Sequence, residues 1–106
     1  MNKVTLLGHL CADPVLETKG DKAYIQFKVA VRRRYRSDGQ ADADFIQVRA
    51  WTFLADFISN HFAKGDMIAI CGEIRTDTYE DDKKQRHYST YVLAEEAYFT
   101  ANKLNR

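Results

Sequence analysis

Residues 44 to 51 alternate in a way that could present chemistry on one side of an extended chain. Successive side chains of a strand point to opposite faces. One face would be an apolar set, Ile46, Val48 and Ala50. The opposite face would carry Phe45, Gln47, Arg49 and Trp51. Large aromatic side chains exposed to water usually mark a contact surface. Rings can stack on nucleobases and a guanidinium can bind phosphate, so this face is suited to single-stranded nucleic acid.

Two basic clusters lie outside this segment. The first is Arg32, Arg33, Arg34 and Arg36, and the second is Lys83, Lys84 and Arg86. The net charge is only +1, so the positive charge is local rather than general. A run of charge often forms only a solvated face, and this alternative stays open for the second cluster. Aromatic residues interleave with the first cluster, which favours a nucleic-acid contact there.

The sequence holds no recognisable catalytic or metal-binding motif. Cys11 and Cys71 are far apart, unlike the close pairs of zinc sites, and we expect two reduced, mostly buried thiols. The three histidines, His9, His61 and His87, are isolated from one another. No phosphate-binding loop, dinucleotide fingerprint or nucleophile elbow occurs. We therefore expect no metal, no cofactor and no enzymatic activity.

Hydrophobic periodicity predicts five strands and one short helix. The strands are expected at residues 3–10, 23–34, 44–51, 67–79 and 86–99. The helix is expected at 53–62, capped by Thr52 and ended by Lys64 and Gly65. Three strands, a helix and two strands predict an all-β fold, a five-stranded OB-fold Greek-key barrel with one short helix between strands three and four.

Particular residues refine this prediction. Ile68, Ile70 and Ile74 should point inward from the fourth strand, whereas Arg75 and Tyr79 share its other face. Gly8 predicts a bulge or sharp bend, and Gly72 a kink. Turns are expected at 19–22 and 37–40, and a charged hairpin loop at 80–85. The inward face of the last strand stays ambiguous from periodicity alone.

Length and composition set the broad class. The chain has 106 residues, enough for one domain over 1–106, and 45% of them are hydrophobic, as in a folded protein. No apolar run approaches the roughly 18 residues that span a bilayer, so we expect no membrane partner. The first residues begin directly with strand-like alternation and hold no targeting signal, which predicts a cytoplasmic protein.

An ordered set of residues resembles the bacterial single-stranded DNA-binding protein family. The opening segment, 2–14, resembles its first strand, and Phe27 to Val31 resemble its second. Asp44, Phe45, Val48 and Trp51 resemble its third strand. The segments 54–56, 64–66 and 72–76 with Tyr79 resemble the helix, the turn and the fourth strand, and the last strand also matches. The resemblance spans essentially the whole chain and implies a single-stranded DNA (ssDNA) binding domain, bacterial and nucleoid-associated.

The resemblance also implies site residues. The family stacks bases on aromatic positions that fall here on Tyr35, Phe45, Trp51 and Tyr79. The basic side chains expected at phosphates are Arg32, Arg34, Arg49, Arg75, Arg86, Lys3, Lys83 and Lys84. By its parity Tyr35 continues the core face, so it is outward only if its strand has left the barrel. Alternatives stay open: Phe45 and Trp51 could pack on another subunit, and Tyr79 could support its hairpin.

The family implies partners as well. It forms tetramers, so we expect a homotetramer, with a dimer as the second choice, and Ile46 lies at a subunit-contact position of the family. The sequence departs from the family at His9, where Arg is usual, at Val15 and Glu17 after the Asp13-Pro14 pair, and at Tyr91, where an acid is common. It ends at Arg106 without the acidic, Phe-tipped tail of the family, so recruitment of replication and repair proteins is expected to be lost. Either the chain has been shortened or it is a short, specialised member.

Three rival functions remain at this stage. An OB-fold primosome or RNA-binding accessory protein would carry a similar face. A purely protein-binding oligomeric module would bury the aromatic residues in an interface. An enzyme is the third, although its acidic residues form no recognisable motif.

Overall fold

The computed structural model describes residues 1–35, 38–39 and 42–100. The strands are β1 (Val4–Leu10), β2 (Glu17–Lys19), β3 (Lys22–Arg32), β4 (Ala43–Trp51), β5 (Met67–Glu80) and β6 (Arg86–Tyr98). One helix, α1 (Thr52–His61), lies between β4 and β5. Arg36, residues 37 and 40 of the expected turn at 37–40, and the chain end with Lys103 and Arg106 lie outside the described residues.

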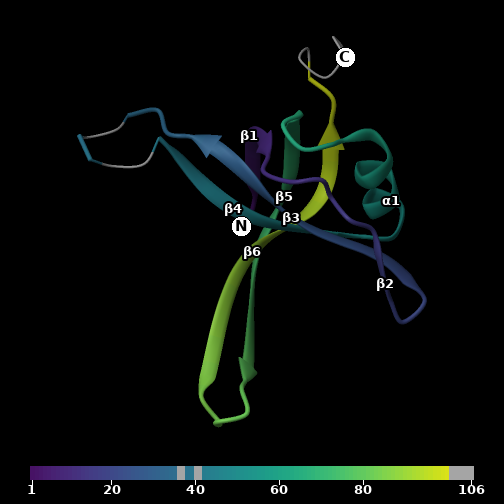
Figure 1. Ribbon diagram of the computed structural model, residues 1–106, viewed down its shortest axis with the longest axis vertical. Coiled ribbons are helices and arrows are strands. Elements are labelled where there is room, and N and C mark those ends of the chain that lie inside the picture. The colour runs from purple at the N-terminus through teal and green to yellow at the C-terminus, as the bar shows by residue number, and fades with distance from the viewer. Residues whose placement is uncertain (36–37, 40–41, 101–106) are drawn as a thin grey trace.

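Five of the strands close into a barrel, as predicted. Neighbouring strands follow the order β1-β5-β6-β4-β3, and β1 pairs again with β3 to complete the ring. All these pairings are antiparallel except the short parallel contact between β4 and β6. The OB-type arrangement with its helix between the third and fourth barrel strands is therefore confirmed (Figure 1).

The core follows the period-2 alternation of the strands. The largest of the fully buried side chains come from three strands and the helix, namely Ile25, Val29, Val48, Ile58, Ile68 and Ile70. Burying a side chain of this size contributes about 1.5–3 kcal/mol. The last strand, ambiguous from sequence, places Val92 and Ala94 inward. Because side chains alternate along a strand, the residues next to these buried ones point outward, and the candidate site residues are among them.

Two glycines permit close approaches between strands. A Cβ at Gly8 would lie 2.4 Å from the carbonyl oxygen of Ala30, where β1 changes partner from β5 to β3. The β1–β5 register is continuous through Gly8, so the expected bulge is absent from β1. A Cβ at Gly72 would lie 2.1 Å from the carbonyl oxygen of Leu93, and the β5–β6 register shifts between Cys71 and Gly72. The predicted kink at Gly72 is thus a β-bulge.

The helix closes one end of the barrel, with Ala55 and Ile58 buried. Its predicted caps are wrong. The chain passes from β4 into α1 without a loop, so Trp51 is the N-cap and makes no side-chain capping bond. Thr52 is the first residue of α1 and has a positive φ of 55°. The helix ends at His61, because Phe62 turns extended to bury its ring. Gly65 instead takes a positive φ of 88° in the connection to β5.

The strand boundaries differ from the predicted ones in ways that matter for the site. β3 ends at Arg32, and therefore Arg34 and Tyr35 follow the strand rather than continue it. The short strand β2, which pairs with β3 around the turn at Gly20, was missed. Beyond Ile74 the paired strands β5 and β6 leave the barrel as a long arm (Figure 1). Ile74 pairs with Val92 and shares its inward face, as predicted, but it lines an open cavity and stays 46% exposed.

Both cysteines are free and half-buried rather than mostly buried. Within the described ranges, no group of His, Cys, Asp and Glu side chains is arranged to hold a metal ion. The same part of the chain contains no helix long and apolar enough to cross a membrane.

Candidate nucleic-acid interface

The outward sides of β3 and β4 form one surface, here called the outer face. Antiparallel pairing sets Tyr24 opposite Trp51, Gln26 opposite Arg49, Lys28 opposite Gln47 and Ala30 opposite Phe45. Phe45 is 62% exposed and Trp51 38% exposed, as their parity predicts. The two rings lie six residues apart on one strand, which at about 3.3 Å per residue separates them by roughly 20 Å. The outer face therefore offers two separate aromatic platforms joined by polar side chains.

Trp51 rests on a second ring that sequence reasoning missed. The rings of Tyr24 and Trp51 are 4.4 Å apart between centroids and inclined by 46°. Tyr24 is only 2% exposed, its burial raises the pKa of its hydroxyl, and the ammonium of Lys19 lies 4.5 Å from its centroid. Its parity with Gln26 and Lys28 could have revealed it. Tyr24 thus limits the movement of Trp51 and leaves part of the indole open to solvent.

Arg49 does not present a free guanidinium. Its Nη1 lies 2.7 Å from a carboxylate oxygen of Asp77 on β5, and its guanidinium carbon lies 3.9 Å from the ring centroid of Tyr91 on β6. Its Nε is buried and has no hydrogen-bond partner among the residues that the structure describes. Burial opposes the charge, but the hydrogen bond and the attraction of Asp77 leave the pKa of Arg49 above its ordinary value. This predicted phosphate ligand therefore also joins three strands.

Tyr79 lies on the β5–β6 arm and is 58% exposed. Its ring stacks on the imidazole of His87 directly opposite, with centroids 5.0 Å apart and planes 19° apart. Nearer the barrel, Arg75 is paired through Nε with Glu73 at 2.8 Å. Another aromatic residue that sequence reasoning missed, Tyr88, is 72% exposed on the opposite face of the arm. Both faces of this arm therefore carry an aromatic side chain.

The remaining predicted residues lie near the N-terminus and at the ends of two hairpins, the β3–β4 hairpin and the β5–β6 arm. Tyr35 is 79% exposed, because β3 ends before it, and the Arg34 guanidinium lies 5.5 Å from its ring centroid. Arg33, a neighbour in the first basic cluster, is paired with Asp44 at 2.8 Å. Among the described residues, six predicted phosphate ligands form no ion pair: Lys3, Arg32, Arg34, Lys83, Lys84 and Arg86.

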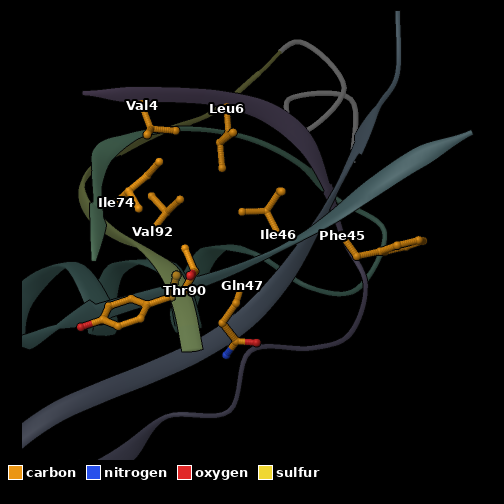
Figure 2. Close-up of a pocket in the computed structure, with 9 residues that line it drawn as sticks. Val4, Leu6, Phe45, Ile46, Gln47, Ile74, Thr90 and Val92 are labelled. Atoms are coloured by element: carbon orange, nitrogen blue, oxygen red, sulfur yellow. The ribbon is translucent and has the colours of Figure 1, made fainter. Parts of the chain in front are cut away.

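A separate apolar cavity of about 430 Å³ opens beside this surface. Its apolar lining is Val4, Leu6, Ile46, Ile74 and Val92, contributed by β1, β4, β5 and β6. Figure 2 shows these five side chains converging on the cavity, whereas Phe45 points away from it. Phe45 therefore belongs to the outer face, and Ile46 belongs to the cavity.

The sequence model of the Single-strand binding protein family matches residues 1–100. The chain belongs to this family. The predicted resemblance is thereby confirmed. On this fold Phe45, Trp51 and Tyr79, the aromatic positions that the resemblance implied, are all exposed.

Several similar proteins carry names that state a ligand. "Single-stranded DNA-binding protein 2" of Streptococcus agalactiae is 45% identical over 95 residues, which are 88% of this chain and 72% of that protein. "Single-stranded DNA-binding protein 3" of Clostridium acetobutylicum is 40% identical over 93% of this chain and 70% of its own length. "Single-stranded DNA-binding protein" of Clostridium tetani is 43% identical over the same shares.

Proposed function

We propose that this family member binds single-stranded DNA with little sequence preference and protects it in replication, recombination or repair. The observation that carries the proposal is the set of outward aromatic side chains on a barrel of this family, with basic side chains at both of its ends that form no ion pair within the described part of the chain. Every base has a ring face, so stacking tolerates any sequence. Stacking and charge pairing need no cofactor, and we propose a binding protein rather than an enzyme, acting in the bacterial cytoplasm.

The path we propose joins the two hairpins across the outer face. Bases stack on Trp51 and Phe45 on the barrel, on Tyr35 beyond the end of β3, and on Tyr79 on the arm. Phosphates are bound by the basic residues that have no ion pair with another described residue: Lys3, Arg32, Arg34, Lys83, Lys84 and Arg86. Arg49 and Arg75 already have acidic partners, so each would exchange a carboxylate for a phosphate.

Quenching of Trp51 fluorescence by oligo(dT) tests this function, since Trp51 is the only tryptophan. We expect saturable quenching by oligo(dT), and weaker binding of RNA and of duplex DNA of equal length. About five neutralised phosphates give a log–log salt slope of roughly −3.5, at −0.7 for each contact on a single strand. Tighter binding to duplex would refute the proposal. Tighter binding to RNA would favour an RNA-binding accessory protein, and no quenching would favour an oligomeric protein-binding module.

We further propose that the chain assembles into a tetramer, with a dimer as the second choice. Two features support self-association. β1 pairs with β3 only through His9 and Leu10, so residues 4–8 keep one strand edge unpaired among the described residues, and open edges favour pairing with another chain. The apolar cavity lies beside that edge and includes Ile46. Light scattering that gives a 12.3 kDa monomer at micromolar concentration would refute this proposal.

A further inference from the structure

The two rings at the end of the arm form a stacked pair. Tyr79 and His87 face each other across β5 and β6, with ring centroids 5.0 Å apart and planes 19° apart. A flat ring has two faces, and the imidazole lies over one face of the Tyr79 ring. Tyr79 is nevertheless 58% exposed, so most of its remaining surface is open to solvent.

The imidazole is itself held in place by the loop. Its Nε2 lies 2.8 Å from Oδ2 of Asp81. The other carboxylate oxygen of Asp81 accepts hydrogen bonds from the backbone N–H groups of Lys83 and Gln85, each 2.9 Å long. The backbone of Asp81 also donates to the carbonyl oxygen of Gln85 at 3.0 Å. Asp81 therefore fixes both the path of the loop and the position of the His87 ring.

A ring fixed before binding is a better stacking platform than a free one. An exposed tyrosine that rotates freely loses conformational entropy when a base stacks on it. Contact with His87 restricts that rotation in advance, and it leaves only one ring face open to a base. The Tyr79 ring is therefore held in one orientation, with a single face accessible to a base.

We propose that His87 is a positioning residue for ssDNA binding, which holds the Tyr79 ring so that one face of it receives a base. The inference deepens the proposed function, because it rests on Tyr79 being a base-stacking residue. His87 acts through Tyr79 and Asp81 acts through His87, so their contributions to affinity are coupled.

A double-mutant cycle on the full chain tests this coupling, with fluorescence anisotropy of labelled oligo(dT) as the measurement. We expect His87→Ala to weaken binding about three- to tenfold in the natural chain, from the entropy of ordering one side chain. In the Tyr79→Ala background the same substitution should change affinity less than about twofold. His61→Ala, a histidine on α1 away from the arm, is the control and should leave affinity unchanged.

Two replacements separate positioning from general support of the loop. His87→Phe keeps a ring against Tyr79 and should recover most of the lost affinity, whereas His87→Gln keeps a polar group without a ring and should not. An equal loss in both backgrounds, or rescue by Gln and not by Phe, would overturn the proposal. If Tyr79→Ala has no effect while oligo(dT) still quenches Trp51, the His87 proposal fails and the proposed function stands. If the natural chain does not bind oligo(dT) at all, the proposed function itself is refuted.

Discussion

The Arg49 guanidinium on β4 lies 2.7 Å from the Asp77 carboxylate on β5, in the middle of the proposed DNA path. A carboxylate in this place does what a phosphate oxygen would do, because both accept charge-assisted hydrogen bonds from a guanidinium. We therefore expect Asp77 both to position Arg49 and to compete with DNA for it. The side chain of Asp77 is about half exposed, so this competition takes place where a phosphate can reach.

Asp77→Asn should strengthen ssDNA binding. A partly exposed ion pair is worth about 0–1 kcal/mol, so removing it should raise affinity by up to about fivefold. Releasing Arg49 for one phosphate should also make the log–log salt slope steeper by about 0.7. Anisotropy titrations of labelled oligo(dT) over a range of salt concentrations measure both quantities.

The matched control is Asp82→Asn on the exposed arm loop, which removes the same charge without touching Arg49. If Asp77→Asn raises ssDNA affinity no more than Asp82→Asn does, the gain comes from the loss of one negative charge and not from the release of Arg49. If it weakens binding, the ion pair serves only to hold the strands together.

Trp51→Ala and Phe45→Ala should each weaken binding to labelled oligo(dT), because a base stacked on a ring contributes about 1–3 kcal/mol. Both rings point outward, so circular dichroism and thermal unfolding should show the fold retained. Phe53→Ala is the control: Phe53 is 80% exposed on α1, off the outer face, and its loss should change affinity little. Unfolding of the Trp51 or Phe45 variants would instead assign these rings to packing.

Gly72→Ala should destabilise the barrel. The added Cβ would lie 2.1 Å from the Leu93 carbonyl oxygen at the bulge, so the backbone must move. Overpacking of this kind costs about 1–3 kcal/mol. The urea concentration at the unfolding midpoint should be lower for Gly72→Ala than for the natural chain. The control Thr76→Ala, on the exposed arm, should leave the midpoint almost unchanged. An unchanged midpoint for Gly72→Ala would mean that the strands separate easily at this position.

Ile74→Glu should reduce the oligomeric state. Ile74 lines the apolar cavity but is 46% exposed in the single chain, so a carboxylate there costs little until a second subunit covers it. Multi-angle light scattering is the measurement. Val15→Glu, at an apolar position 68% exposed and outside that cavity, should leave assembly unchanged. If Ile74→Glu assembles like the natural chain, subunits meet elsewhere.

The pKa of Asp81 should lie below its ordinary value of 3.8, chiefly through the hydrogen bond from His87 and also through the backbone of Gln85 and Lys83. Because the pKa of Asp81 is lower in the folded chain than in the unfolded chain, its ionised carboxylate stabilises the folded arm at pH values above the unfolded-state pKa. This stabilisation is lost as the pH falls through the folded-state pKa. Carboxyl NMR titration should show the Asp81 pKa rising in His87→Ala. The pKa of Asp44, lowered by Arg33, should not change in that variant. No change at Asp81 would mean that the loop backbone alone lowers its pKa.

The sequence by itself determined which residues share a face. Alternation in a strand is a local property of the backbone, so Phe45 and Trp51 were assigned outward, and Val48 and Ala50 inward, without knowledge of any partner strand. The order of elements along the chain, three barrel strands, a helix and two more strands, also followed from the periodic segments, and it predicted the OB-type barrel. The predicted helix cap at Thr52 was wrong because β4 runs directly into α1, so the strand's last residue, Trp51, takes the N-cap position.

Only the tertiary structure decided what each outward side chain contacts. Arg49 meets Asp77 and Tyr91, Trp51 meets Tyr24, and Tyr79 meets His87. The Arg49–Asp77 pair joins residues 28 apart, and such contacts depend on strand register and on the twist that brings separate strands together. Ile74 shows the same limit, since its parity places it on the inward face but does not show that it lines an open cavity and stays 46% exposed. Periodicity assigns a residue to a face, whereas the packing of distant strands determines whether that face is buried, paired or open.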